Sequence, residues 1–274
     1  MSIINCPNCK STLKQFDKML QCQNGHSFDY SKEGYINLLL ANQKRKLNPG
    51  DNKEMMNARE AFLSTGHFNF LIDFIEASIN SLNVNSRTKT ETTYLLDLGC
   101  GSGYYTRSLF RNSKINKIGI DISKAGISKA SKNDKNSIYI VGSVYDLPIE
   151  DRSVEIVLNI FSPVSIDEVK RVLKPGGYFL KVVPAEDHMK EIATLIYDSF
   201  IPHKSSIETD IALNSDLQII KVEKLEKVIV LSDKNLHNLI SMTPYLYKFE
   251  RGELEKLEEM SITISFKIII AQYG

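Results

Sequence analysis

An apolar run that passes directly into three closely spaced glycines most restricts the fold of this 274-residue chain. The run Tyr94–Leu98 is followed by Gly99, Gly101 and Gly103, and a helix-like segment starts at Tyr104. Glycines allow such a sharp turn because they adopt backbone conformations closed to other residues, and they leave no side chain between backbone and ligand. The pattern predicts a parallel strand, a turn and a helix whose N-terminus can hold a nucleotide-like ligand.

Two acidic residues narrow the choice of ligand. Asp97 stands two positions before the first glycine, and Asp121 ends the next apolar run, 24 residues after Asp97. A carboxylate at that second position can accept hydrogen bonds from both ribose hydroxyls of a nucleotide. The glycines occupy every second position, unlike the dinucleotide spacing G-x-G-x-x-G, so the loop resembles motif I of class I methyltransferases, which use S-adenosylmethionine (SAM). An NAD-type site and a turn without a ligand are the alternatives.

Apolar runs and helix-like segments alternate after this loop. The alternation predicts an α/β fold with a mostly parallel sheet covered by helices on both faces. The β-branched stretch 261–271 suits a closing antiparallel strand. Two amphipathic helices ahead of the loop, one capped by Asp51 and one following Gly66, are expected to pack on the sheet. Strands are expected at 94–98, 117–121, 138–141, 154–160 and 178–183, with helices beginning at 104 and 123.

Residues near the N-terminus have the spacing of a zinc site. Cys6, Cys9, Cys22 and His26 form the pattern C-x2-C-x12-C-x3-H. Thiolates and an imidazole nitrogen suit a tetrahedral zinc ion, and four protein ligands leave no open position for chemistry. A disulfide framework is the competing interpretation, but three cysteines with a histidine in a cytosolic chain argue against it. We therefore predict a structural zinc ion, which would supply much of the folding free energy of so small a segment.

Charge is unevenly distributed along the chain. The formal net charge is +1, but residues 1–46 carry seven lysines and arginines against three acids, which gives +4 there and −3 in the remainder. Lys14 and Lys18 fall in an expected hairpin, and aromatic residues such as Phe28 and Tyr30 follow it. Basic and aromatic side chains together can bind phosphates and stack on unpaired bases. A solvated basic surface, with aromatics that pack the small zinc core, is the alternative.

The chain is expected to divide into three parts. Residues 1–36 would form a zinc-binding domain suited to RNA recognition, residues 37–93 a linker with the two packing helices, and residues 94–274 the methyltransferase-like domain. No apolar run approaches the ~20 residues needed to span a bilayer, and the N-terminus lacks the layout of a signal peptide. We therefore expect no membrane contact and a cytoplasmic location. Whether the chain forms a homodimer is left open by its sequence.

Residues after the third and fourth expected strands are candidates for the ligand pocket. Asp146 stands where methyltransferases commonly place an acid facing the adenine amino group, and a turn-capping aspartate is the alternative. Phe161 and Pro163 follow the fourth strand, where enzymes that methylate amino groups or bases often carry a polar-Pro-aromatic segment. The full Asn/Asp-Pro-Pro-aromatic motif is absent. Glu33, Asp146 and Asp187 are conceivable proton acceptors, and the sequence assigns that role to none of them.

These features together resemble the bacterial 23S rRNA (guanine-N(1))-methyltransferases. The similarity covers nearly the whole chain, and the order of zinc ribbon, linker helices and methyltransferase domain is itself specific. It is carried by Cys6, Cys9, Cys22, His26, Phe28-Asp29, 32–35, 37–39, 49–51, 54–56, 58–59, Gly66-His67, 96–101, 103–106, Asp121, 174–177 and 242–244.

The resemblance implies a Rossmann-like class I fold with a mostly parallel seven-stranded sheet. It also implies methyl transfer from SAM to ring nitrogen 1 of a guanine in a 23S rRNA hairpin near the peptide exit tunnel. Two branches of the family modify neighbouring guanines, and one branch is linked to macrolide (antibiotic) resistance.

The resemblance also assigns cofactor-binding residues. In the family pattern SAM is contacted by the glycine loop and by the positions of Phe68, Tyr105, Thr106 and His188. Phe68 stands where the family has a tyrosine, so its ring can stack on the ligand without a hydroxyl hydrogen bond. The sequence Ala185-Glu186-Asp187 before His188 departs from the Gly-Pro-Arg of the family.

Two functions of other classes stay open beside this one. The chain could be a small-molecule methyltransferase in which the zinc ribbon has no RNA to bind. It could also be a non-catalytic ribosome assembly factor that binds RNA and retains a SAM pocket. The basic N-terminal part argues against the first, and the intact glycine loop with Asp121 argues against the second.

Overall fold

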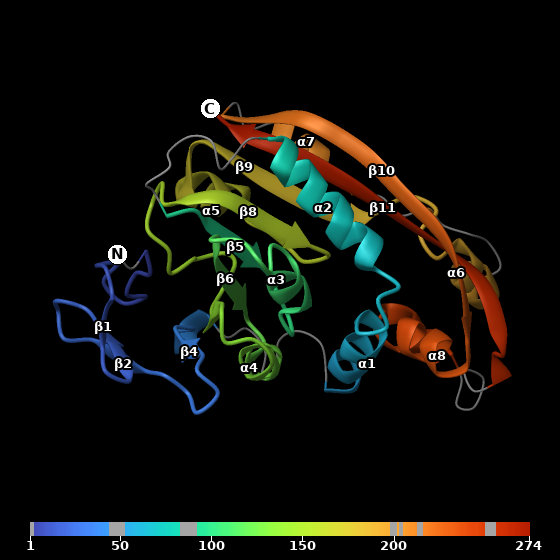
Figure 1. Cartoon of the computed structure of the whole chain (residues 1–274), viewed down its shortest axis with the longest axis horizontal. Coiled ribbons are helices and arrows are strands. Elements are labelled where there is room, and N and C mark those ends of the chain that lie inside the picture. The colour runs from blue at the N-terminus through green and yellow to red at the C-terminus, as the bar shows by residue number, and fades with distance from the viewer. Residues whose placement is uncertain are drawn as a thin grey trace.

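The computed structural model describes residues 3–43, 53–82, 92–197, 202, 205–212, 216–249 and 256–274. These residues form one large mixed sheet with helices on both faces and a small three-stranded sheet near the N-terminus (Figure 1). The expected cap Asp51 and part of the expected linker 37–93 lie outside the described residues. None of the helices within these ranges is both long and apolar enough to cross a membrane.

The large sheet has eight strands in the order β10-β11-β9-β8-β5-β6-β7-β4. The strands from β9 to β4 run parallel, whereas β11 is antiparallel to both of its neighbours. The bounds are β4 Ile36–Asn37, β5 Tyr94–Leu98, β6 Asn116–Asp121, β7 Ile138–Val141, β8 Val154–Ile160, β9 Leu173–Pro184, β10 Leu217–Ser232 and β11 Glu259–Tyr273.

The predicted α/β class and the five predicted parallel strands are confirmed. Seven strands come from residues 94–274, as expected for the catalytic part. The eighth is β4, which lies at the expected boundary between residues 36 and 37 and pairs with β7. The N-terminal segment therefore closes one edge of the catalytic sheet.

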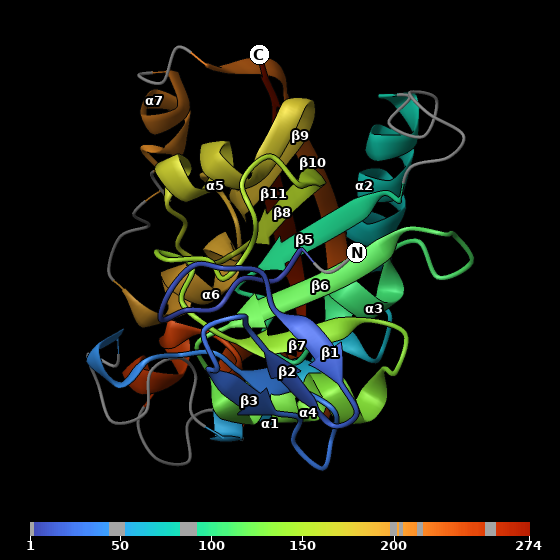
Figure 2. The same cartoon turned by 90° about the vertical axis from the view of Figure 1, so that its left-hand side faces the viewer.

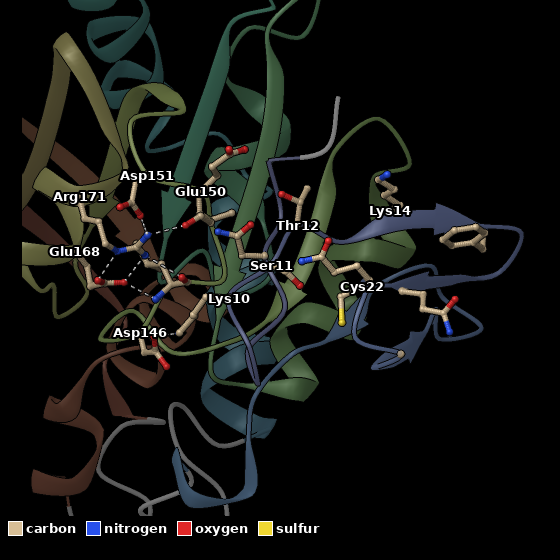
Figure 3. A pocket seen from close by; sticks show the side chains of 17 residues that line it. Lys10, Ser11, Thr12, Lys14, Cys22, Asp146, Glu150, Asp151, Glu168 and Arg171 are labelled. Atoms are coloured by element: carbon tan, nitrogen blue, oxygen red, sulfur yellow. Dashed lines mark hydrogen bonds and ion pairs between the residues drawn. The ribbon is translucent and has the colours of Figure 1, made fainter.

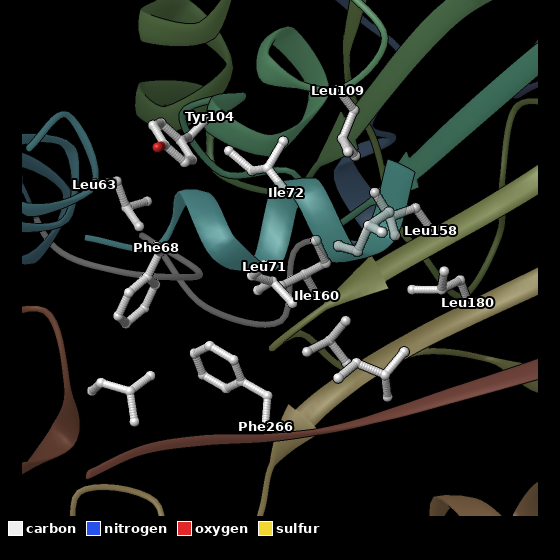
Figure 4. Close-up of a cluster of buried hydrophobic side chains, with 14 of the residues drawn as sticks. Leu63, Phe68, Leu71, Ile72, Tyr104, Leu109, Leu158, Ile160, Leu180 and Phe266 are labelled. Atoms are coloured by element: carbon white, nitrogen blue, oxygen red, sulfur yellow. The ribbon is translucent and has the colours of Figure 1, made fainter. Parts of the chain in front are cut away.

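Helices pack on both faces of this sheet because apolar side chains recur on one side of each helix. On one face, Leu71 and Ile75 of α2 pack against a cluster that includes Leu158, Leu180 and Phe266 of the sheet (Figure 4). On the other face, α5 and α7 contribute buried residues to a second cluster. The helices are α1 Lys53–Leu63, α2 Asn69–Ser81, α3 Tyr104–Ser108, α4 Lys124–Asn133, α5 Ile166–Val172, α6 Lys190–Ile196, α7 Ile207–Ala212 and α8 Asp233–Ser241.

The small sheet is antiparallel and contains the expected hairpin (Figure 2). Its strands are β1 Lys14–Phe16, β2 Met19–Gln21 and β3 Ser27–Asp29. The segment before it is bound to the catalytic part, because Asn5 N–H donates to the Pro148 carbonyl oxygen (2.9 Å) and Ile4 forms a β-bridge with Ile149. Buried Ile4 and Leu13 belong to the same apolar cluster as Ile149. This N-terminal sheet thus shares a core with the large sheet.

Candidate functional site

A cavity of about 780 Å³ opens at the carboxyl ends of the parallel strands. The loops after β5 and β6 and the ends of β8 and β9 line it. Helix α1 and the segment 242–245 line it as well, and Arg59 of α1 donates a hydrogen bond to the Met242 carbonyl oxygen (3.0 Å). Ligands of open α/β sheets bind at this edge.

The three glycines of the loop have different roles, although all have positive φ angles of +73°, +55° and +70°. A Cβ atom on Gly99 would overlap with Ser162 Oγ, and one on Gly103 would lie 2.7 Å from the Tyr139 hydroxyl oxygen. A Cβ atom on Gly101 would meet no atom within 4 Å. Gly99 and Gly103 are therefore needed for packing, whereas Gly101 presents bare backbone to the cavity that it lines.

Asp121 is placed as expected, at the end of β6 and in the wall of the cavity. Its two carboxylate oxygens accept hydrogen bonds from the backbone N–H groups of Gly101 (2.9 Å) and Ser123 (2.7 Å). Each carboxylate oxygen has two lone pairs, so a carboxylate offers roughly four acceptor positions. Asp121 thereby joins the glycine loop to the start of α4.

Glu60 of α1 fixes the loop from the other side. Its carboxylate accepts a hydrogen bond from Ser102 Oγ (2.7 Å) and forms an ion pair with Arg107 (2.5 Å). Arg107 in turn donates to the Ser102 carbonyl oxygen (2.9 Å). The helix that precedes the catalytic part is therefore tied to the cofactor loop by partly buried charges.

Asp97 and Thr106 lie behind the loop and do not line the cavity. Asp97 is 2% exposed, and its Oδ2 accepts a hydrogen bond from the fully buried Thr106 hydroxyl (2.5 Å). Burial, with the nearby charge of Asp121, raises the pKa of Asp97 to about 7. Gly103 is likewise absent from the lining. Asp97, Gly103 and Thr106, which were expected to bind the cofactor, therefore lie beside the cavity and do not line it.

Aromatic side chains form one wall of the cavity. Phe68 is 2% exposed and packs edge-on against Phe266, with ring centroids 5.3 Å apart (Figure 4). His188 lies 5.1 Å from the same Phe266 ring, and its Nδ1 accepts a hydrogen bond from the Ser265 N–H (3.2 Å). Tyr105 also lines the cavity, and its buried hydroxyl has no hydrogen-bond partner among the described residues. Other atoms of Tyr105 therefore face the cavity, whereas its hydroxyl is closed off from it.

Lys181 is a site residue that the sequence analysis did not identify. It lies in β9 with 5% exposure, lines the cavity, and donates hydrogen bonds to Asn159 Oδ1 and to the Ser162 carbonyl oxygen (2.5 Å for the latter). Burial lowers the pKa of its ammonium group to about 8. These bonds fix the segment that carries Phe161, whose side chain lines the cavity and is 40% exposed. A lysine inside an otherwise apolar strand is the signal that could have revealed it.

Asp146 is placed away from this cavity. Its carboxylate pairs with Lys10 of the N-terminal segment (2.5 Å) and accepts a hydrogen bond from Gln43 (2.7 Å). It lines a second cavity, of about 1190 Å³, between the N-terminal sheet and the catalytic part (Figure 3). The residues at its expected position in the first cavity are Ser143, Val144 and Tyr145.

The four predicted zinc ligands converge at the base of the small sheet. The ligand atoms of Cys6, Cys9, Cys22 and His26 all lie within 4.8 Å of one another, with Cys9 Sγ 3.7 Å from Cys22 Sγ. A tetrahedral site with Zn–S bonds of about 2.3 Å needs sulfur atoms roughly 3.8 Å apart. A hydrogen bond from Ser11 lowers the pKa of Cys9 to about 5, which favours the thiolate that zinc requires. The donor set therefore fits zinc.

Two family models match separate parts of the chain. A model described as "Methyltransferase domain" matches residues 96–180, and a zinc-ribbon model described as "RlmA, N-terminal" matches residues 4–46. With the strand order, the glycine loop and the Cys3His cluster, they define a class I SAM-dependent methyltransferase with an N-terminal zinc ribbon.

Comparison with individual relatives gives a narrower assignment. The chain is 32% identical over 98% of its length to a putative 23S rRNA (guanine-N(1)-)-methyltransferase of Bacillus subtilis, covering 96% of that protein. It is 26% identical to the 23S rRNA (guanine(748)-N(1))-methyltransferase of Streptomyces fradiae, over 97% of this chain and 95% of that protein. A putative 23S rRNA (guanine-N(1)-)-methyltransferase of Micromonospora griseorubida is 30% identical over 69% of this chain and 68% of its own length. The chain belongs to the family of 23S rRNA (guanine-N(1))-methyltransferases.

Proposed function

We propose that this chain transfers a methyl group from SAM to ring nitrogen 1 of a guanine in a 23S rRNA hairpin. The observation that carries the proposal is that the glycine loop, Asp121 and the aromatic wall surround one cavity. The fold alone would suit many methyl acceptors. The choice of guanine is supported by relatives that are named for this reaction and match nearly the whole chain.

The proposed cofactor contacts follow from the lining of the cavity. Asp121 would accept hydrogen bonds from the ribose hydroxyls while it holds the loop, and Gly101 would let the ligand lie against bare backbone. Phe68, His188 and Tyr105 would pack against the ligand. Asp97, Gly103 and Thr106 are proposed as supports of the loop and not as direct contacts.

The protein must also align the guanine that accepts the methyl group. Bound SAM would supply an electrophilic methyl group, so positioning and loss of the guanine N1 proton are what the protein must provide. Ring nitrogen 1 lies on the pairing edge of the base, which has to leave its stack to reach the cavity. The exposed face of Phe161 is proposed to stack on the flipped guanine. Lys181 is proposed as a positioning residue that holds the segment 159–163 in place.

The zinc ribbon is proposed to bind the RNA. Cys6, Cys9, Cys22 and His26 would hold a structural zinc ion that fixes residues 1–36, the proposed recognition domain. Phe16 is 51% exposed at the tip of the β1–β2 hairpin, and Lys14 beside it is exposed too. These side chains are suited to a base and a phosphate, respectively. With an rRNA substrate, we propose that the chain works in the cytoplasm.

The cavity between ribbon and catalytic part is a poorer phosphate site. Two of its three basic residues, Lys10 and Arg171, already pair with carboxylates, as Figure 3 shows for Arg171 with Asp151 and Glu168, and the third is Lys14 of the hairpin. The acids in its lining therefore neutralise the cations that a backbone phosphate would need. We propose that the hairpin residue Lys14, at the ribbon side of this cavity, makes the main phosphate contacts, and that the paired Lys10 and Arg171 do not.

The test is transfer of tritiated methyl from SAM to protein-free 23S rRNA, with reverse-transcription stops mapped afterwards. A methyl group on ring nitrogen 1 blocks base pairing and halts the transcriptase. We expect one stop, at the guanine for which the Streptomyces relative is named. A stop at a neighbouring guanine would assign the other branch of the family, and transfer to a metabolite without RNA would contradict the proposal.

Asp121→Asn separates cofactor binding from RNA recognition. The asparagine amide accepts hydrogen bonds only through its oxygen, whereas the carboxylate accepts through two. SAM affinity in calorimetry should therefore fall about tenfold or more, while RNA binding is unchanged. Unchanged SAM affinity would remove Asp121 from the ribose role. SAM binding by the unaltered chain without turnover on rRNA or assembled ribosomal particles would favour an assembly factor.

A further inference from the structure

Helix α4 carries three lysines on its outward face. Because an α-helix has 3.6 residues per turn, Lys124, Lys129 and Lys132 fall within an arc of about 140° around its axis. The residues between them on this face, Ala125 and Ser128, are small. The buried residues of the helix lie on the opposite arc and are Gly126, Ile127, Ala130 and Ser131. The outward face of α4 is therefore basic and has neither an acidic nor a large apolar side chain.

These lysines are poorly neutralised by the rest of the protein. Among the described residues, the Lys124 side chain has no hydrogen-bond or ion-pair partner, and Lys129 Nζ donates only to the neutral Asn57 Oδ1 (3.2 Å). Lys132 is 61% exposed and lies 3.8 Å from the Glu33 carboxylate. Other lysines form closer pairs with carboxylates: Lys10, Lys170, Lys174, Lys221, Lys224 and Lys267. The lysines of α4 thus remain available to an anionic partner.

Helix α4 lies between the N-terminal segment and α1, beside the first cavity. Figure 1 shows it between β4 and α1, and hydrogen bonds tie it to both sides. Ser131 Oγ donates to the Glu33 carbonyl oxygen (2.8 Å), and Lys129 reaches Asn57 of α1. Ser123, which caps the N-terminus of α4, lines the cavity. With a rise of 1.5 Å per residue, Lys132 lies about 14 Å from Ser123 along the helix axis, so a strand that enters the cavity has the whole face within reach.

Two exposed lysines extend this face at its ends. Lys32 precedes Glu33 in the loop that contacts α4, and Lys53 lies on α1 one helical turn before Asn57. We call the set of five the α4 basic band: Lys32, Lys53, Lys124, Lys129 and Lys132. The chain after residue 46 has a net charge of −3, so a group of cations there with so few acids is a local feature and not the average of the surface.

We propose that the α4 basic band binds the phosphate backbone of the RNA strand that leads into the cavity. Lysine ammonium groups attract phosphates as point charges, and the small residues between them leave room for a backbone to approach. A membrane surface or a protein partner would need apolar side chains among the lysines, which the outward face of α4 lacks. The inference rests on the proposed RNA substrate and adds a second contact surface to Lys14 of the hairpin.

The band would position the RNA without reading its sequence. Phosphate contacts fix the register of a nucleic acid on a protein and carry no information about the bases. Neutralising the band should therefore weaken rRNA binding and raise KM for rRNA, while the same guanine is still methylated. The cofactor should bind as before, because these side chains point away from the cavity.

The salt dependence of RNA binding is the first test. In the triple variant K124Q/K129Q/K132Q, affinity for protein-free 23S rRNA should fall at least tenfold at about 0.1 M salt, and the slope of log K against log salt should become shallower by about 2–3. Thermal unfolding and SAM affinity should match those of the unaltered protein. An unchanged slope and affinity in the triple variant would overturn the proposal.

The matched control removes the same charge elsewhere. Lys114 is exposed just before β6, at the end of that strand away from the cavity, and Lys221 and Lys227 are exposed on β10 at the far edge of the sheet. The variant K114Q/K221Q/K227Q should change rRNA affinity by less than about threefold, since a distant charge acts only through the screened net charge. Equal losses in the two triple variants would contradict a specific band.

Lysine acetylation tests the band in the unaltered protein. With 23S rRNA bound, Lys124, Lys129 and Lys132 should be acetylated several-fold more slowly, as measured by mass spectrometry, while Lys114 in the same sample reacts at its rate in free protein. No protection of the band would overturn the inference even if the protein methylates rRNA, and the proposed function would then stand without it. Protection of the band by rRNA that is never methylated would leave the inference standing and contradict the proposed methyl transfer.

Discussion

The Thr106 hydroxyl donates a hydrogen bond of 2.5 Å to Oδ2 of Asp97, and both side chains are buried beneath the glycine loop. The acid at the end of β5 is thus occupied by the first turn of α3 and stands behind the loop. Burial raises its pKa to about 7, so near neutral pH this carboxyl titrates within the folded protein. Protonation of Asp97 therefore affects the stability of the protein at the position where the glycine loop is supported.

Asp97→Asn should remove one pH-dependent component of stability. In the unfolded chain the carboxyl has its ordinary pKa near 4, so from about pH 4 to pH 7 the folded state holds a proton that the unfolded state releases. The contribution of Asp97 to the free energy of unfolding therefore increases as the pH falls from 7 to 4. Between pH 7 and pH 4 the difference in free energy of unfolding between wild type and variant should change by on the order of 2–4 kcal/mol, because one pKa unit corresponds to about 1.4 kcal/mol.

Urea unfolding at pH 5 and pH 8 measures this difference. The variant should be the more stable protein at pH 8, where wild-type Asp97 is charged in a buried site, and should lose that advantage at pH 5. A difference between variant and wild type that does not vary with pH would show that Asp97 ionises normally in the folded state.

Two glycine substitutions should separate packing from ligand binding. Gly103→Ala would place a methyl group against Tyr139 and Ala130 and should lower the free energy of unfolding by about 1–3 kcal/mol. Gly101→Ala has a similar positive φ but meets no atom, so it should destabilise by only about 1 kcal/mol and instead reduce SAM affinity at least tenfold. Calorimetric titration with SAM, beside thermal unfolding of both variants, gives the comparison. A reversed order of the two effects would contradict the assignment of Gly101 to the ligand.

Local sequence patterns predict those parts of the fold that are determined by residues close together in the chain. The apolar runs before Asp97 and Asp121 fix two adjacent strands, and the Cys/His spacing fixes the zinc cluster, because each pattern lies within a short segment. Strand β10 was not predicted, since charged residues such as Lys224 and Glu226 interrupt its apolar alternation at an exposed edge.

Contacts between distant segments could not be predicted. Asp146 was expected at the adenine, but Lys10 and Gln43, more than a hundred residues away in the chain, bind its carboxylate at the second cavity. Likewise, only the packing of β9 beside β8 shows that Lys181 reaches Asn159. Each case depends on a side chain whose partner is set by tertiary structure.

Cys22→Ser should release the proposed zinc ion and disturb the catalytic sheet as well as the ribbon. Leu13 and Leu20 of the ribbon belong to the same buried cluster as Ile149, so loss of the metal would expose part of a shared core. We expect less than one zinc per chain by metal analysis, a lower melting temperature, and loss of rRNA binding before loss of SAM binding.

The control for this variant is Cys100→Ser, at the cysteine that lies in the glycine loop and outside the metal cluster. It should keep one zinc per chain and an unchanged ribbon. Unaltered protein that contains no zinc after purification without chelators would contradict the zinc assignment.

Lys181→Met should reduce methyl transfer more than cofactor binding. The substitution keeps most of the side-chain volume but removes the donor to Asn159 Oδ1 and to the Ser162 carbonyl oxygen, so the segment that carries Phe161 loses its anchor. We expect kcat/KM for rRNA to fall at least tenfold and SAM affinity to change less than about threefold, with a loss of about 1–3 kcal/mol in the free energy of unfolding. The double variant K181M/N159L should be less stable still, because the Asn159 amide also donates hydrogen bonds to the Leu98 carbonyl oxygen (2.8 Å) and to Ser162 Oγ (2.5 Å). Equal losses in SAM affinity and in rRNA methylation would show that Lys181 supports the cavity as a whole and not the acceptor segment.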